Sequence, residues 1–139
     1  MLVVTAEGEI VLLTTIVVAS TAFPFRVHLY VNDHSPSVTD LLADYVEAGF
    51  PGYVAAQTLG GALSVDVINQ SGKIEWSSVE FKPSSALPDR LRVFGYYVTD
   101  PLNVFCLWAE RFPQRVFLRD PGDAVVFRPT LGSLSEFTG

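Results

Sequence analysis

Two histidines and three aspartates lie between positions 28 and 44, and these are residue types that can bind a metal ion. Asp33, His34, Asp40 and Asp44 fall in or near one loop, and His28 lies in the predicted strand ahead of it. A metal site needs histidine or carboxylate ligands that converge from two elements. All four loop residues also suit ordinary places in a turn or on a helix face. We therefore predict that the loop binds no essential metal.

The other reactive side chains do not combine into a catalytic set. Cys106 is the single cysteine and lies among large apolar residues, which favours a buried, inert thiol. No serine lies in a nucleophile elbow. The acidic pairs Glu75 with Glu80 and Asp120 with Asp123 are explained by strand faces and a turn. We predict that the protein is not an enzyme, takes no cofactor, and has no catalytic, cofactor-binding or metal-binding residues.

Composition narrows the classes of partner. The chain has 139 residues, of which 49% are hydrophobic and 17% charged, and its net charge is −6. Its length predicts a single domain over residues 1–139. The acidic balance and scattered basic residues argue against a nucleic-acid partner. The apolar stretch 10–23 is shorter than the ~20 residues that span a bilayer and follows two glutamates, so we expect a soluble protein without a membrane partner.

A predicted hairpin dominates the chain. The segments Leu91–Thr99 and Asn103–Glu110 are rich in valine and aromatic residues, which suit strands, and Asp100-Pro101 predicts the turn between them. Both faces of the hairpin are largely apolar, which predicts a central place in a sandwich. We expect a β-sandwich core that includes Phe25, Val27, Leu29, Val93, Trp108 and Val125.

Other segments extend this picture. Residues 24–31 alternate as a half-buried strand does, and the spacing of Ser37 and Asp40 predicts a capped helix over 38–46. A parity shift within 73–82 indicates a bulge, and residues 114–119 and 124–130 read as further strands. Residues 5–19 fit a helix or a strand, with length favouring the helix. The fold class is mainly β: an antiparallel sandwich of jelly-roll type with about eight strands and one or two short helices.

Two stretches resemble a known group of proteins. One runs from Leu29-Tyr30-Val31-Asn32 to Phe50-Pro51-Gly52-Tyr53, and the other includes Gly95-Tyr96-Tyr97-Val98-Thr99-Asp100 and Leu107-Trp108-Ala109-Glu110-Arg111-Phe112. Over residues 25–130 the order is similar to that of small virion structural proteins of tailed bacteriophages. The resemblance implies a capsid cement or decoration protein on the virion surface. It also implies contact with the major capsid protein or another virion protein, and assembly as a homotrimer.

An apolar, weakly charged chain of this kind is expected to bury part of its surface in a partner. Strand parity places some apolar residues on outward faces, and the apolar start of the chain is a further candidate. The candidate interface residues are Leu2, Val3, Val4, Tyr30, Phe105 and Leu107. The alternative is a glycan-binding module of a phage fibre or another host-recognition structure, with an aromatic platform drawn from Tyr30, Tyr53, Trp76 and Tyr96.

Overall fold

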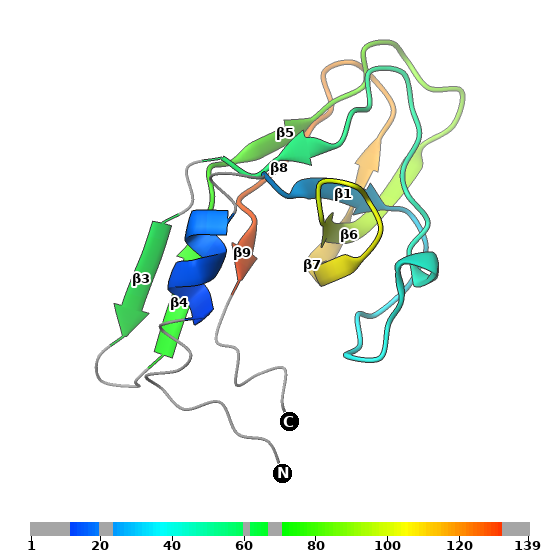
Figure 1. The fold of residues 1–139 in the computed structure, drawn as a ribbon. Coiled ribbons are helices and arrows are strands. Elements are labelled where there is room, and N and C mark those ends of the chain that lie inside the picture. The colour runs from blue at the N-terminus through cyan, green and yellow to red at the C-terminus, as the bar shows by residue number, and fades with distance from the viewer. Residues whose placement is uncertain (1–11, 20–23, 60–61, 67–70, 132–139) are drawn as a thin grey trace. The chain divides into compact units, whose positions relative to one another are not determined.

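The computed structural model describes residues 12–19, 24–59, 62–66 and 71–131 (Figure 1). Within them the chain is mainly antiparallel β, as predicted, with nine strands in three open sheets, an α-helix over 12–19 and a 3-10 helix. The chain divides into two compact units. Unit 1 comprises Met1–Pro24, Thr58–Ser77 and Arg128–Gly139; unit 2 comprises Phe25–Gln57 and Ser78–Phe127. The single domain over 1–139 stays a prediction.

A four-stranded sheet is the main element of unit 2. Its order is β2 (Ala56–Gln57), β1 (Arg26–Tyr30), β6 (Leu91–Thr99) and β7 (Cys106–Leu118). The predicted hairpin is confirmed, and β6 has the predicted bounds. The prediction that the whole hairpin is central is wrong, because β7 is the outer strand of this sheet. β7 is also longer than expected, since it takes in the segment predicted as a separate strand over 114–119.

A wide bulge explains how β7 continues through a proline. Val93 of β6 pairs with Val116, whereas Gly95, two residues later, pairs with Arg111. Four residues of β7 between these partners therefore face a single residue of β6. Pro113 lies in this stretch, where its missing N–H removes no regular ladder bond. A proline between two apolar runs was the reason to predict two strands.

A smaller sheet completes the core of unit 2. It pairs β5 (Val79–Phe81) with β8 (Val125–Phe127). The ring of Phe127 stacks on that of Tyr96 in β6 at 4.6 Å between ring centres, so aromatic rings join the two sheets. Five of the six predicted core residues are buried, namely Val27, Leu29, Val93, Trp108 and Val125, while Phe25 is half-buried.

Unit 1 contains the α-helix over 12–19 and a sheet of β3 (Ala62–Asp66), β4 (Ser71–Glu75) and β9 (Thr130–Leu131). The helical reading of 5–19 is confirmed for 12–19, and its earlier residues lie outside the described part. Leu13 is fully buried. No helix among the described residues is both long and apolar enough to cross a membrane.

Two segments predicted as single strands are each divided between two sheets. The parity shift within 73–82 marks a break between β4 and β5, and the expected bulge there is wrong. The backbone N–H of Trp76 donates to the carbonyl of Pro129, and that of Ser77 donates to the carbonyl of Leu59. The first bond continues the β4–β9 pairing by one residue, whereas β5 pairs with β8. Residues 124–130 are divided in the same way between β8 and β9.

The predicted helix over 38–46 is also wrong, apart from one short turn. A 3-10 helix, η1, covers Leu42–Asp44. The Asp40 carboxylate accepts the backbone N–H of Ser37 at 2.9 Å, as one half of a capping box does. The Asp40 N–H, however, donates to the Ser37 carbonyl and closes a tight turn. The acid at this spacing therefore stabilises a turn instead of starting a helix.

Candidate functional site

The segment after β1 folds back over one face of the four-stranded sheet. The Val31 N–H donates to the Val46 carbonyl, and the Ala48 N–H donates to the Leu29 carbonyl, both at 2.9 Å. This cover buries the face of β1 that was predicted to be polar. Tyr30 is 0% exposed and His28 only 4%, so the prediction of a half-buried strand is wrong. Alternation could not reveal this, because the covering residues come from an irregular loop.

Four aromatic rings form a row, two from the sheet and two from this loop. The His28 ring stacks on Tyr97 at 4.7 Å between ring centres, and Tyr97 stacks on Tyr45 at 5.1 Å. His34 meets the Tyr45 ring edge-on at 5.2 Å. A histidine therefore stands at each end of a tyrosine pair, and each histidine contacts a carboxylate.

The first histidine links a hydroxyl group to a carboxylate. His28 Nδ1 contacts Glu47 Oε2, and His28 Nε2 lies 2.8 Å from the hydroxyl of Thr99. The Tyr53 hydroxyl donates to the same glutamate oxygen at 2.8 Å. Hydroxyl, imidazole and carboxylate in series can activate a nucleophile. Thr99 is 0% exposed, so no substrate reaches its oxygen and we interpret the network as structural.

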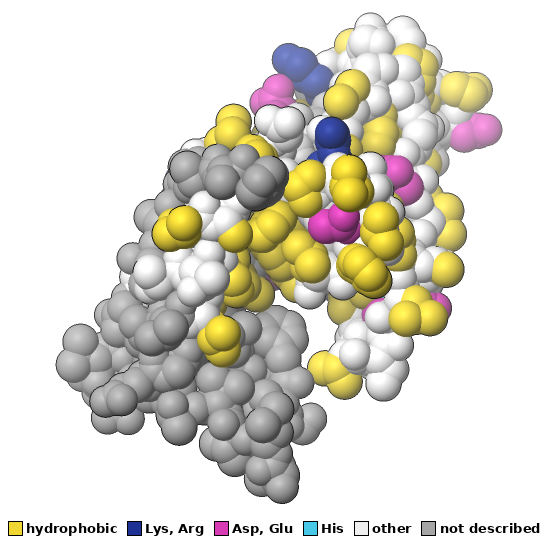
Figure 2. All heavy atoms as spheres, in the orientation of Figure 1, with side chains coloured by type: hydrophobic (Ala, Val, Ile, Leu, Met, Phe, Trp, Pro, Cys, Tyr) yellow, Lys and Arg dark blue, Asp and Glu magenta, His cyan; other side chains and the backbone are white. Residues whose placement is uncertain are grey.

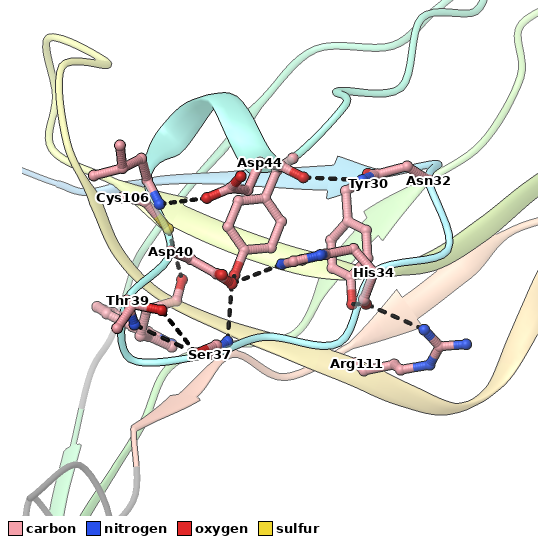
Figure 3. Close-up of polar contacts among 12 residues, drawn as sticks. Tyr30, Asn32, His34, Ser37, Thr39, Asp40, Asp44, Cys106 and Arg111 are labelled. Carbon is pink, nitrogen blue, oxygen red and sulfur yellow. Dashed lines mark hydrogen bonds and ion pairs between the residues drawn. The ribbon is translucent and has the colours of Figure 1, made fainter.

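The second histidine belongs to a network centred on Asp40 (Figure 3). One Asp40 oxygen lies 2.7 Å from His34 Nε2 and accepts the Tyr45 hydroxyl at 2.6 Å. The hydrogen bond from Tyr45, together with those from His34 and Ser37, lowers the pKa of Asp40. Burial, followed by the bond to Asp40, raises the pKa of Tyr45, and burial raises that of Tyr30 to about 12. Both tyrosines therefore remain protonated donors at neutral pH.

The four residues considered for a metal site are engaged in other hydrogen bonds and ion pairs. Arg111 Nη1 lies 2.7 Å from Asp33 and also donates to the His34 carbonyl. His34 and Asp40 bind each other, and Asp44 accepts a backbone N–H of its own turn. Among the residues that the structure describes, no three metal-ligating groups converge. The absence of an essential metal stays a prediction.

Cys106 packs against the buried cluster of Tyr30, Tyr45, Phe94 and Tyr97 and is half-buried. Burial raises the pKa of its thiol to about 11. The thiol is therefore protonated at neutral pH, whereas a nucleophilic cysteine needs the thiolate.

The turn between β6 and β7, residues 100–105, has a different character. The Asp100 carboxylate accepts the backbone N–H groups of Leu102, Val104 and Phe105 at 3.1, 2.8 and 2.7 Å. These bonds, that from Phe105 above all, lower the pKa of Asp100. The Asn103 N–H donates to the Asp100 carbonyl, and Asn103 takes the left-handed conformation, with φ of 57°. We call this segment the β6–β7 turn.

The side chains of the β6–β7 turn face solvent. Leu102 is 82% exposed, Val104 54% and Phe105 66%, and Leu107 just beyond is 44% exposed. Phe105 is the only exposed aromatic side chain in the described part of the chain. Figure 2 shows hydrophobic side chains gathered on the face where this turn lies. A turn with its backbone donors satisfied internally thus presents apolar side chains to water.

The predicted interface residues differ in their exposure to solvent. Phe105 and Leu107 are exposed, as an interface requires. Tyr30 is buried and does not belong to the surface. Leu2, Val3 and Val4 lie outside the described residues. Sequence reasoning missed Leu102 and Val104, although two apolar residues inside a turn that opens with Asp-Pro were a usable signal.

The predicted glycan platform is not an exposed surface. Tyr30, Trp76 and Tyr96 are buried, at 0%, 1% and 2% exposure, and Tyr53 is half-buried. Sugar rings stack on the open faces of aromatic side chains, so these four cannot form a platform as they lie.

Comparisons with known proteins give no relative for this chain: no family model, no curated protein and no solved structure matches it.

We expect Thr99→Val to lower the free energy of unfolding by about 1–3 kcal/mol, because it leaves the buried His28 Nε2 without its hydroxyl partner. Valine has nearly the shape of threonine, so packing is retained. The measurement is urea unfolding followed by circular dichroism, with the exposed Thr39→Val as control. Equal unfolding midpoints for the two variants would show that the His28 network contributes no stability.

Proposed function

We propose that the chain is a virion structural protein of a tailed bacteriophage, which decorates or cements the capsid by binding the major capsid protein lattice. The observation that carries the proposal is the β6–β7 turn, whose backbone bonds to Asp100 and whose Leu102, Val104 and Phe105 are exposed. The kind of particle, a phage capsid, is proposed because the segments around residues 29–53 and 95–112 resemble virion structural proteins of tailed bacteriophages.

Exposed apolar side chains on an ordered turn favour attachment for two reasons. Each such group covered by a partner contributes roughly 25 cal/mol per Å² of apolar area removed from water. A turn already fixed by Asp100 loses little conformational entropy when it docks, so more of that gain remains as affinity. Contiguous exposed apolar surface of this kind commonly marks an interface.

A catalytic role has less support. The hydroxyl–imidazole–carboxylate series ends at the inaccessible Thr99, and the pKa of Cys106 is raised to about 11. The glycan-binding alternative loses its main support because its aromatic residues are buried or half-buried.

The proposal includes a homotrimer and a jelly-roll sandwich of about eight strands. Leu107 supports self-association, because it is exposed on β7, the outer strand of the larger sheet. Outer strands with apolar side chains are usually covered, often by another subunit. The jelly-roll arrangement stays a prediction derived from strand spacing and the resemblance.

We expect Phe105→Asp to weaken attachment to the capsid by at least about thirtyfold, which is typical of removing a central anchor residue. The measurement is co-sedimentation of the purified protein with capsids of its phage that lack it. The control is Val126→Asp, which places the same charge at an exposed valine of β8. Attachment reduced equally by both variants, or by neither, would contradict a role for the β6–β7 turn.

A further inference from the structure

Three arginines surround one aromatic ring where β6 begins and β7 ends. The guanidinium carbons of Arg90, Arg92 and Arg115 lie 4.5, 6.0 and 5.8 Å from the centre of the Phe117 ring. Arg92 pairs with Phe117 across the two strands, and Arg115 precedes it by two residues. The three side chains are exposed, and Phe117 is half-buried. We call these four residues the arginine cluster.

The cluster gathers positive charge that the described residues do not neutralise directly. In that part of the chain, the arginines in ion pairs are Arg111 and Arg128. Because each guanidinium carbon lies within 6.0 Å of the Phe117 ring centre, no two of them are more than about 12 Å apart. The Debye length at physiological salt is about 8 Å, so the groups repel each other and salt screens part of that repulsion. The negative face of the Phe117 ring offsets part of this repulsion. An anion among them would relieve the remainder.

The surroundings of the cluster favour a small anionic group over an extended polyanion. Asp89 directly precedes Arg90, and Asp120 and Asp123 follow β7 within a few residues. A nucleic-acid backbone, which presents a phosphate every few ångströms, would meet these carboxylates and the net charge of −6. One or two side-chain carboxylates, by contrast, can contact the arginines without approaching these acidic residues. Guanidinium groups bind such carboxylates through paired, directional hydrogen bonds.

We propose that the arginine cluster is a binding site for an acidic segment of a partner protein, recognised through the side-chain carboxylates of aspartate or glutamate. The cluster lies at the opposite end of β6 from the β6–β7 turn, so the two contacts are separate. The site depends on the geometry of four side chains and does not depend on capsid attachment.

The test is titration of the full chain with a capped glycine peptide that carries two adjacent glutamates, at low salt, followed through the arginine Nε–Hε NMR signals. We expect the signals of Arg90, Arg92 and Arg115 to shift together. The triple variant Arg90→Gln, Arg92→Gln and Arg115→Gln should weaken binding at least fivefold, since several surface ion pairs are lost. The control triple variant Lys73→Gln, Lys82→Gln and Arg128→Gln removes the same charge from other exposed pairs and should bind as the wild type does.

Three results would overturn the proposal. One is the absence of a shift at the cluster signals with millimolar peptide, and another is equal weakening by the two triple variants. The third is tighter binding of a short DNA duplex than of the diglutamate peptide at the same arginines, which would make the site one for phosphate backbones. If the cluster triple variant does not fold, Arg90→Gln, which removes the guanidinium group nearest the ring, replaces it in the comparison.

Discussion

Gly95→Ala is expected to prevent the larger sheet of unit 2 from forming in its native arrangement. Gly95 pairs with Tyr30 across β6 and β1, and the Tyr30 ring lies directly over it. A Cβ atom at Gly95 would come within 2.6 Å of the Tyr30 ring and hydroxyl and would overlap the carbonyl oxygen of Glu110. Neither neighbour can move freely, since one is backbone and the other is fully buried. We expect a loss of more than about 3 kcal/mol in the free energy of unfolding.

The measurement for Gly95→Ala is urea unfolding followed by circular dichroism, with near-ultraviolet spectra to report tyrosine packing. The matched control is Gly49→Ala, because a Cβ atom at Gly49 meets no atom within 4 Å. The control should unfold within about 0.5 kcal/mol of the wild type. Similar midpoints for both variants would show that Tyr30 does not pack on Gly95 as described.

Alkaline pH is expected to unfold the protein steeply between about pH 10 and pH 12. Burial raises the pKa of Tyr30, Tyr45, Tyr53 and Tyr97 above the ordinary value of 10.0. Below pH 10 both states keep these protons, so stability is unaffected. Above it the unfolded chain releases protons that the folded chain retains, and the free energy of unfolding falls. Tyr30, with its pKa raised to about 12, accounts for about 3 kcal/mol of this loss.

Tyrosinate absorbance and circular dichroism, recorded together against pH, measure this effect. The two signals should change together, because these tyrosines ionise on unfolding. Tyr97→Phe keeps the stacked ring and removes one titrating hydroxyl, so its transition should be shallower and lie at higher pH. Smooth ionisation of every tyrosine near pH 10, with the fold intact, would contradict the raised pKa values of these four tyrosines.

The sequence predicted the local elements better than their pairing. β6 has its predicted bounds because strand-forming residues fill it and Asp100-Pro101 ends it. β7 was divided in two, because a proline inside a strand normally ends it and no local signal announces a bulge that tolerates one. The splits of 73–82 and 124–130 have a similar cause. The hydrogen bonds at these breaks connect residues that are distant in sequence, so no local pattern reveals them.

The candidate site was less predictable than the fold. Thr99 is 71 residues from His28, and Glu47 is 19 residues away, so no motif spacing connects them. Both histidines were identified as possible ligands, but their environment depends on a loop without a regular pattern. The β6–β7 turn was predicted as a turn. Only the structure shows that the Asp100 carboxylate accepts three backbone N–H groups from the exposed residues after it.

We propose that the protein attaches to a phage capsid through the β6–β7 turn, and a cryo-EM map of the phage particle proposed to carry it is the decisive measurement. We expect three copies around local symmetry axes of the outer capsid surface, with Leu102, Val104 and Phe105 buried against the major capsid protein. Absence of the protein from purified particles, or copies whose Phe105 faces solvent on the assembled capsid, would contradict it.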